Sequence, residues 1–316
     1  MSSTTSVSSE YRALTTGCGL LDRSERGKLA LAGGEAKGFL QGQVSNDVES
    51  LTPGTGCYAA FLTPKGKMLG DLRILDGGDE LLLDTERVAL QGLFNMIRRF
   101  SIGYDVQLHK RTLERGLLAL IGPEATLVAG TEQLADAPEH THVETSVTGV
   151  PVRAIRTDAG VELLCDAADT QRLEAALRVA GVPRVEEAVA EALRVEHGRP
   201  RYGIDLDDTV IPQEAGLNER AVSFTKGCYV GQETVARLHY RGKPNRHLRG
   251  LRLAAPAQPG DPVQSGEREV GRVTSVVDSP RLGWIALALV RREAPPGSPV
   301  TVGDGVNGEV VELPFT

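Results

Sequence analysis

The most distinctive stretch of the sequence is Lys226-Gly227-Cys228-Tyr229-Val230-Gly231-Gln232-Glu233. It places a cysteine beside a lysine and ahead of a segment in which Val235 and Leu238 are spaced as on one helix face. The amino end of a helix dipole and a nearby ammonium group both favour a thiolate over a thiol. The stretch therefore predicts that the pKa of Cys228 is lowered, while a purely structural cysteine stays an open alternative.

The other three cysteines lie in a different setting. Cys18, Cys57 and Cys165 have apolar neighbours, and no two of the four cysteines form a C-x-x-C pair. Closed zinc sites and iron-sulfur cages usually need such pairs. We therefore expect no metal site made by this chain alone, and we expect these three residues to act as small buried hydrophobes.

Composition and length indicate a soluble globular protein of two or three domains. The chain has 316 residues, of which 41% are hydrophobic and 24% charged. It contains no run of about 18 apolar residues, so no membrane span is expected. Residues 1–10 are rich in Ser and Thr and contain neither a basic start nor an apolar core, which predicts a disordered tail and argues against secretion. We expect a cytoplasmic protein.

The net charge of -7 disfavours general nucleic-acid binding. The charge is unevenly distributed, because residues 226–252 carry seven Lys or Arg and a single acid, Glu233. Such a run is most often a solvated surface. The functional alternative is a docking site for an anionic ligand or an acidic partner.

The first half of the chain predicts an α+β unit. Alternating residues on both sides of the turn 64–67 predict a hairpin, and a further strand, a helix and a strand follow it. This order is typical of a ferredoxin-like arrangement. Asp71 falls on the second hairpin strand, where it is a candidate acid if it points inward and ordinary surface if it points outward. The predicted ranges are strands at 57–63, 68–75, 80–84 and 104–109 and a helix at 86–100.

A second α+β region and a β-barrel are predicted beyond residue 112. The polar loop 136–145 contains His140 and His142, which we expect to be exposed to solvent, because no third metal ligand lies nearby. After Pro244, short strands between Pro and Gly turns predict a barrel of about 70 residues. The expected domains are an α+β region at 11–243, made of two interwoven subdomains of which one spans roughly 50–112, and a barrel at 244–316.

Two further polar positions are candidates for ligand binding. Asn46 follows a short helix predicted at 35–43, where it either caps a turn or faces a pocket. Glu196 ends the helix predicted at 186–198, just before a Gly/Pro loop, where it is either a ligand-binding carboxylate or a surface charge. The chain has no nucleotide-binding glycine fingerprint, phosphate loop or Ser/His/Asp motif.

Taken together, these motifs resemble the YgfZ family of folate-binding proteins, relatives of the aminomethyltransferase (T-protein, GcvT) of the glycine cleavage system. The resemblance covers nearly the whole chain. The stretch 226–233 resembles the YgfZ signature, whereas the other motifs are shared with the transferase. The other motifs are Leu21-Asp22-Arg23-Ser24, Phe39-Leu40-Gln41, Asn46-Asp47-Val48, Asp71-Leu72, Leu193-Arg194 with Glu196 and Gly198, and Pro212 with Glu214 and Leu217.

The resemblance implies a ring of two α+β domains and one β-barrel, with tetrahydrofolate in the central hole. It implies support for the assembly or repair of iron-sulfur enzymes, with folate and iron-sulfur enzymes or assembly proteins as partners and neither nucleic acid nor membrane. Glu196 would hold the pterin edge, and the basic run from Arg237 to Arg252 would receive the anionic glutamate tail. The implied site consists of the catalytic residues Cys228 and Asp71, the cofactor-binding residues Asn46, Asp71, Glu196, Lys226 and Arg237, and no metal.

Two departures from the transferase favour the iron-sulfur factor. Gly70-Asp71-Leu72 stands where the transferase resembles D-D-L, so one of two acids is missing, and Cys228 stands where the transferase has an acid. Aminomethyl transfer needs a carboxylate to manage protons, and Asp71 alone leaves that activity open. The alternatives are a tetrahydrofolate-dependent aminomethyl-type transferase of one-carbon metabolism and a non-catalytic adapter that keeps the folate hole only as scaffold.

Overall fold

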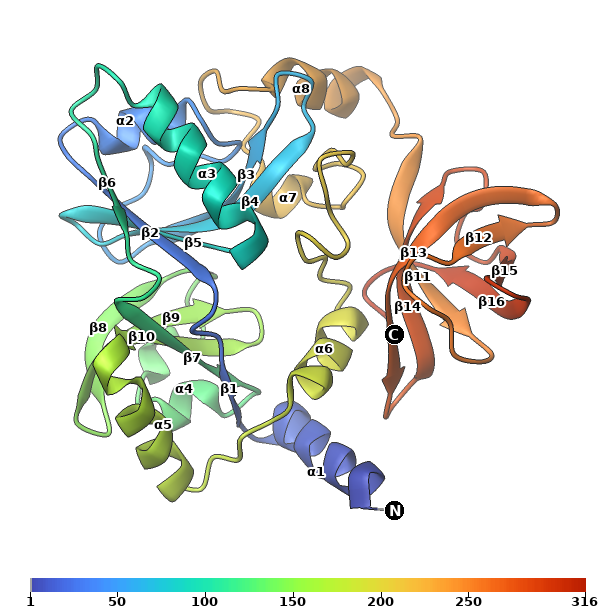
Figure 1. Ribbon diagram of the computed structural model, residues 1–316, viewed down its shortest axis with the longest axis horizontal. Helices are drawn as coiled ribbons and strands as arrows, with labels where there is room; N and C mark the ends of the chain where they lie inside the picture. Colours follow the sequence, from blue (N-terminus) through green and yellow to red (C-terminus); the bar gives the residue numbers. More distant parts are fainter. Residues whose placement is uncertain (1) are drawn as a thin grey trace.

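The computed structural model describes residues 2–316, with side chains from Ser9 onward, as two five-stranded sheets and a closed barrel (Figure 1). The first sheet has the order β3-β4-β5-β2-β6 and the second the order β1-β7-β10-β9-β8. The strands of the first are β2 Gly27–Ala32, β3 Gly56–Leu62, β4 Met68–Asp76, β5 Glu80–Thr85 and β6 Gln107–Lys110. Those of the second are β1 Gly19–Asp22, β7 Arg115–Ile121, β8 His142–Val147, β9 Val150–Thr157 and β10 Gly160–Asp166.

The barrel follows in the C-terminal part of the chain and closes in the order β11-β14-β13-β12-β15-β16. Its strands are β11 Arg246–Leu253, β12 Pro262–Ser265, β13 Arg268–Ser279, β14 Gly283–Arg291, β15 Pro299–Val302 and β16 Val306–Val311. The predicted fold class, two α+β domains and a small β-barrel, is confirmed. Within the barrel, the sequence predicts strands at 248–253, 269–277, 284–290 and 298–302, which correspond to β11, β13, β14 and β15, but not the short strands β12 and β16.

The two α+β domains are interwoven through the first strands of the chain. β1 pairs with β7 in the second sheet, whereas β2, only a few residues later, pairs with β5 in the first. The chain then stays in the first domain until β6 and returns to the second with β7. The two sheets therefore lie side by side in Figure 1, and side chains from both face the space between them.

Helices cover the sheets and link the domains. α3 buries Ala89, Leu93 and Ile97, spaced four residues apart, against the first sheet. Val88, one residue before this buried stripe, is an apolar side chain that stays exposed. The helices are α1 Ser2–Thr16, α2 Ala36–Gln41, α3 Arg87–Phe100, α4 Ala125–Val128, α5 Thr170–Val179, α6 Glu187–Glu196, α7 Asn218–Ala221 and α8 Gln232–Arg241, with 3-10 turns at Glu132–Leu134 and Ala167–Asp169.

The disordered tail predicted for residues 1–10 is wrong for the part of it that the structure describes, because α1 begins at Ser2; Met1 lies outside the described residues. Serine and threonine are weak helix formers, so packing supplies the stability. Leu14 is buried against Val185 and Val189, and the Tyr11 hydroxyl bonds to Glu196 of α6.

The expectation that His140 and His142 lie in an exposed loop is also wrong. His140 is 8% exposed and His142 is 1% exposed. The reason is that β8 begins at His142 and pairs with β9, so the segment is part of the second sheet. Among the described residues, no helix is long and apolar enough to cross a membrane.

Candidate functional site

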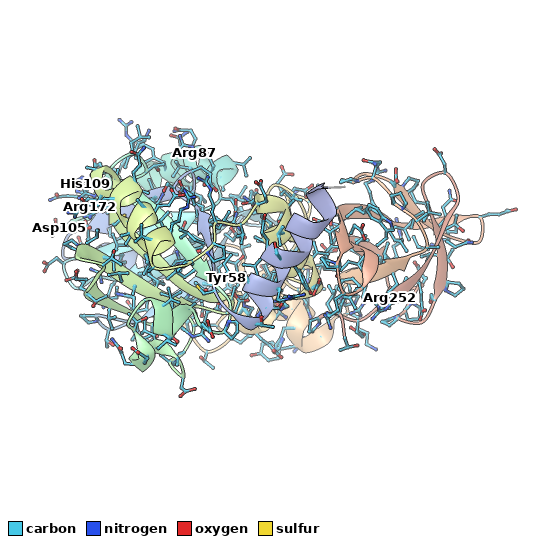
Figure 2. The ribbon with its side chains drawn as sticks, turned by 90° about the horizontal axis from the view of Figure 1, so that it is seen from below. Tyr58, Arg87, Asp105, His109, Arg172 and Arg252 are labelled. Atoms are coloured by element: carbon cyan, nitrogen blue, oxygen red, sulfur yellow. The ribbon has the colours of Figure 1, made fainter. Side chains whose placement is uncertain are left out.

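A cavity of about 260 Å³ lies between the two α+β domains and α6. Its walls are unusually rich in charge, and no described residue of the barrel strands lines it. Tyr58, which lines it, lies near the middle of the molecule in Figure 2, far from the peripheral Asp105, His109 and Arg172. The lining arginines are Arg23, Arg26, Arg73, Arg194, Arg199, Arg201 and Arg220, and the lining acids are Asp71, Asp84, Glu86, Glu139, Asp158 and Glu162.

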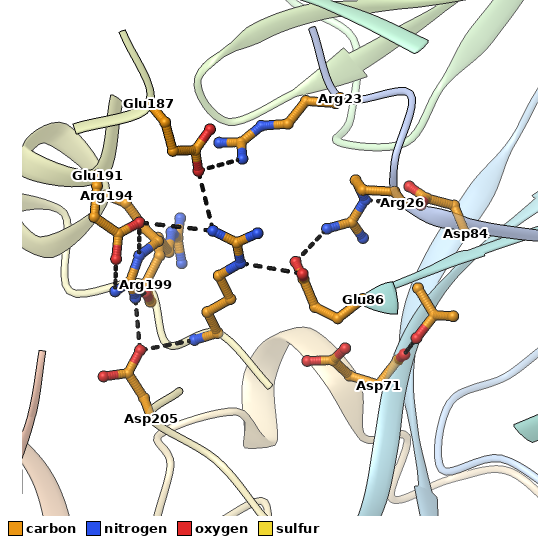
Figure 3. Close-up of polar contacts among 12 residues, drawn as sticks. Arg23, Arg26, Asp71, Asp84, Glu86, Glu187, Glu191, Arg194, Arg199 and Asp205 are labelled. Atoms are coloured by element: carbon orange, nitrogen blue, oxygen red, sulfur yellow. Dashed lines mark hydrogen bonds and ion pairs between the residues drawn. The ribbon is translucent and has the colours of Figure 1, made fainter. Parts of the chain in front are cut away.

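Each lining arginine forms an ion pair with at least one carboxylate, and Figure 3 shows part of this arrangement. Arg201 contacts Glu86 and Glu187, with nitrogen–oxygen distances of 3.1 Å to each. Arg26 bonds to Asp84 at 2.8 Å and also contacts Glu86. These pairs connect α6, the segment after it and the first sheet, so ion pairs help to hold the cavity walls together.

Arg73, on β4, forms ion pairs with one carboxylate of each sheet. Its Nη2 atom lies 2.6 Å from Asp84 on β5 and 2.6 Å from Glu162 on β10. The Arg73 side chain is nearly buried, and so are both carboxylates. Removing either partner of such a pair would leave an unpaired buried charge, which strongly destabilises the folded protein.

Asp71 is the exception among the cavity acids. The other five each pair with an arginine, whereas Asp71 forms no ion pair with any described residue. Its Oδ2 atom accepts a 2.6 Å hydrogen bond from the Tyr58 hydroxyl. Burial raises the pKa of Asp71 to about 6, against the opposing effects of Tyr58 and Arg26. This carboxyl can therefore exchange a proton near neutral pH, as a general acid or base must.

The hairpin register brings Tyr58 and Asp71 together. β3 and β4 pair antiparallel, with Ala60 opposite Asp71, so Tyr58 is a diagonal neighbour of Asp71 on the same face. Asp71 is also fixed through its carbonyl oxygen, which accepts a hydrogen bond from Thr85 at 2.5 Å. The sequence predicted the hairpin and Asp71. It missed Tyr58, which the register and the period of two could have indicated.

Asn46 and Lys226 support the site from outside the cavity. The Asn46 side-chain amide donates to the Tyr58 carbonyl at 2.8 Å and to the Arg220 carbonyl at 3.2 Å. Lys226 donates from Nζ to the carbonyls of Gln41, Val44 and Asn46 at 2.6, 2.8 and 2.8 Å. Burial lowers the pKa of Lys226 to about 8, against the opposing effect of Asp47. Neither side chain lines the cavity.

Glu196 lies at the end of α6, and it also does not line the cavity. Its carboxylate accepts hydrogen bonds from Tyr11 at 2.8 and 3.0 Å and from Ser279 at 2.6 Å, and it pairs with Arg281 at 3.3 Å. These partners come from α1 and the barrel. Glu196 thus joins three parts of the fold, and its oxygens are already engaged.

Replacing Glu196 with alanine tests this structural role. We expect the variant to lose about 1–3 kcal/mol of stability in urea unfolding, because the hydroxyls of Tyr11 and Ser279 lose their buried acceptor. We expect its affinity for a ligand of the central cavity to stay unchanged. If Glu196 holds the pterin edge, as the family resemblance implies, the ligand affinity would instead fall. Tyr11→Phe is the control, since it removes only the hydroxyl that α1 contributes.

Cys228 is exposed on the loop that precedes α8. Gly231, with φ 86°, fixes the end of this loop against the β3–β4 hairpin, since a Cβ there would lie 2.6 Å from the Thr63 carbonyl oxygen. The Lys226 ammonium group bonds to carbonyls of residues 41–46, and the cysteine that affects its pKa is Cys57. The contacts of Lys226 therefore do not support its expected part in activating Cys228.

The basic run 226–252 does not form one continuous surface. Arg246 pairs with Glu214 and Arg249 with Glu312, while Arg252 bonds to the carbonyl of Thr316. Arg237, Arg241 and Lys243 are exposed at α8 and just after it, and none of their side chains has a hydrogen-bond or ion-pair partner among the side chains and backbone that the structure describes. Arg237 does not line the cavity.

The other three cysteines were expected to be buried, and two of them are. Cys18 and Cys165 are buried, and Cys57 is only partly buried. Burial raises the pKa of Cys18 and of Cys57 to about 12, which makes both poor nucleophiles. Among the described residues, no group of three or more His, Cys, Asp or Glu side chains could hold a metal ion.

Comparison with known protein families shows to which family the chain belongs. Residues 2–226 match the GCVT N-terminal domain, and residues 246–316 match the glycine cleavage T-protein C-terminal barrel domain. The chain therefore belongs to the glycine cleavage T-protein (GCVT) family, and the predicted superfamily is confirmed. The comparisons do not separate the YgfZ branch from the others.

Relatives of several names resemble the chain over most of its length. A protein named putative transferase At1g60990, chloroplastic, from Arabidopsis thaliana is 28% identical, over 96% of this chain and 72% of that protein. An aminomethyltransferase from Rubrobacter xylanophilus is 31% identical, over 98% of this chain and 86% of that protein. A protein named tRNA-modifying protein YgfZ, from Colwellia psychrerythraea, is 28% identical, over 78% of this chain and 75% of that protein.

A solved structure resembles the whole fold. The glycine cleavage system aminomethyltransferase T from Bartonella henselae superposes with a TM-score of 0.86, at 24% identity, over 98% of this chain and 89% of that protein. At this identity the likeness shows the fold alone. It supports the three-domain architecture described above.

Proposed function

We propose that this protein binds tetrahydrofolate in the central cavity and, in that form, supports the assembly or repair of iron-sulfur enzymes. The observation that carries the proposal is Asp71, the one cavity acid without an arginine partner among the described residues. With a pKa near 6, its carboxyl can bond to an amine in either protonation state.

The residues of the cavity fit a reduced pterin. A pterin presents N–H donors and a carbonyl along its edges, and the cavity offers the Asp71 carboxyl, the Tyr58 hydroxyl and a buried nitrogen of His140. Asp71 and Tyr58 would hold the ring, and Asn46 would keep Tyr58 in place. When bound, tetrahydrofolate supplies nitrogens that accept a one-carbon unit.

The protein's own contribution to the chemistry is control of one proton. Asp71 can take or give a proton at its carboxyl oxygens near neutral pH. Tyr58 orients the carboxyl, and the ion-paired arginines keep their charges on the cavity walls. None of these steps requires Cys228, which is exposed on the loop outside the cavity.

The iron-sulfur part of the proposal rests on Cys228. Its thiol is exposed on a loop that Gly231 fixes against the hairpin, so it is accessible to another protein. We expect Cys228→Ala to abolish the activation of a dependent iron-sulfur enzyme while tetrahydrofolate affinity stays unchanged. The measurement is enzyme activity in extracts of a deletion strain that carries each variant. Full activation by Cys228→Ala would contradict this role, and Cys18→Ala serves as the control for loss of a thiol.

Aminomethyl transfer is the second candidate function, and the observation that favours it is the raised pKa of Asp71. Proteins named aminomethyltransferase are also among the relatives. This activity predicts transfer from a lipoyl carrier protein to tetrahydrofolate that is lost in Asp71→Asn and retained in Cys228→Ala. The two proposals thus differ in which variant removes function.

A further inference from the structure

His140 occupies a strained position at the junction of the two α+β domains. Its backbone has φ 73°, in the left-handed region that residues other than glycine seldom adopt. Its N–H donates to the Arg156 carbonyl at 2.8 Å, and its own carbonyl oxygen lies 3.0 Å from where a Cβ on Gly56 of β3 would stand. The surrounding strands therefore hold His140 in a conformation that the residue alone would not choose.

The imidazole lines the central cavity and leaves one nitrogen without a partner. Nε2 lies 3.6 Å from the Glu139 carboxylate, whereas Nδ1 is buried without a hydrogen bond. The nearby carboxylate favours the tautomer with the proton on Nε2, so Nδ1 carries a free lone pair. Leaving a buried acceptor unpaired costs free energy.

The surroundings also keep the ring neutral. Burial lowers the pKa of His140 to about 3, with Arg73 and Arg220 acting in the same direction and Asp158 and Asp84 opposing them. A neutral imidazole can accept a hydrogen bond, whereas a protonated one can only donate. At neutral pH, this cavity-lining residue therefore keeps an unpartnered acceptor.

His140 stands apart from the other cavity residues in this respect. The unbonded Glu162 oxygen forms an ion pair with Arg73. Among the described cavity-lining side chains, His140 Nδ1 is thus the buried acceptor that has neither a hydrogen bond nor an ion pair.

We propose that Nδ1 of His140 accepts a hydrogen bond from a ring or exocyclic N–H group of the bound pterin. The inference rests on the proposed binding of tetrahydrofolate and adds a recognition residue to it. Asp71 belongs to the first sheet and His140 to the loop that enters the second. A ligand held by both residues bridges the two α+β domains.

The test uses two substitutions that suit the backbone. Glycine accepts φ 73° without strain and removes the ring, whereas asparagine tolerates this conformation and keeps a side-chain acceptor. We expect His140→Gly to weaken tetrahydrofolate binding roughly 5- to 100-fold in calorimetric titration, and His140→Asn to weaken it less. His142→Phe is the control, because His142 is a buried histidine with an unpartnered Nε2 that does not line the cavity.

A second readout does not depend on any variant. Nitrogen-15 NMR of the wild-type protein is expected to show an unprotonated Nδ1 of His140 whose resonance moves when tetrahydrofolate is added. Unchanged affinity in His140→Gly, or a resonance that does not move although the ligand binds, would overturn the inference and leave the proposed function standing. If the folded wild-type protein binds no tetrahydrofolate, both fail.

Discussion

Asp71→Asn is expected to weaken tetrahydrofolate binding by roughly 10- to 100-fold at pH 7, because a hydrogen bond to a charged group is worth about 1.5–3 kcal/mol. The same substitution is expected to stabilise the protein without ligand. Asparagine keeps the size of the side chain and can still accept the Tyr58 hydrogen bond, but it removes a buried charge that no arginine neutralises.

The sign of this stability change follows from the pKa of Asp71. The value is about 6 in the folded protein against 3.8 as the ordinary value, so between these pH values the folded state binds more protons than the unfolded state. The contribution of Asp71 to stability is then present below pH 4 and is lost as the pH rises through 6. The difference between these two pKa values corresponds to about 3 kcal/mol of stability.

Urea unfolding of wild type and Asp71→Asn at pH 4 and pH 7 measures this change. We expect the variant to gain stability relative to wild type between the two pH values, by up to about 3 kcal/mol. A stability difference that is the same at both pH values would show that Asp71 does not titrate there. Such a group would have no special capacity for proton transfer at neutral pH.

Arg73→Ala is expected to destabilise the protein by about 3–5 kcal/mol, because it leaves two nearly buried carboxylates without their shared cation. Glu162 loses its ion pair, whereas Asp84 retains Arg26. Since Arg73 on β4 pairs with Glu162 on β10, the substitution also removes an ion pair between the two sheets that form the cavity.

The matched control for Arg73 is Arg115→Ala. Arg115 pairs with Asp166 at the surface, where both side chains are well exposed. Exposed pairs of this kind contribute about 0–1 kcal/mol. Equal losses for the two variants in urea unfolding would contradict the role given to Arg73. In the variant Arg73→Met with Glu162→Gln, the loss should be smaller than the sum of the single changes.

Local patterns in the sequence predicted much of the fold. The hairpin of β3 and β4 shows the period of two on each side of a Pro/Gly turn, and α3 shows the helical period. The prediction of a disordered tail at 1–10 and the prediction of an exposed loop around His140 were wrong for one physical reason. In both, packing against distant segments overrides a local composition that favours exposure.

The site was harder to predict, because its charges come from separate segments. Arg26, Arg201 and Glu86 meet only after the two sheets and α6 assemble. Asp71 could be found, because a lone acid on an apolar hairpin strand is conspicuous in the sequence. The contacts of Glu196 and Lys226 could not be predicted. A charged side chain that binds a ligand and one that joins two domains can stand in the same local sequence.

The cavity can remain open because most of its charged side chains neutralise one another. Its arginines are paired, so they do not repel one another, and its acids are paired except for Asp71. Among the described lining groups, the Asp71 carboxyl has no ion pair and the buried His140 Nδ1 has no hydrogen bond, so both are available to a ligand. We therefore expect the cavity to recognise a polar ring specifically rather than to bind anions nonspecifically.

The most direct test is calorimetric titration of the wild-type protein with tetrahydrofolate at pH 7. We expect saturable binding of one ligand per chain, abolished or strongly weakened in Asp71→Asn and unchanged in Glu196→Ala. The absence of saturable heat in wild-type protein that is folded by circular dichroism would contradict it.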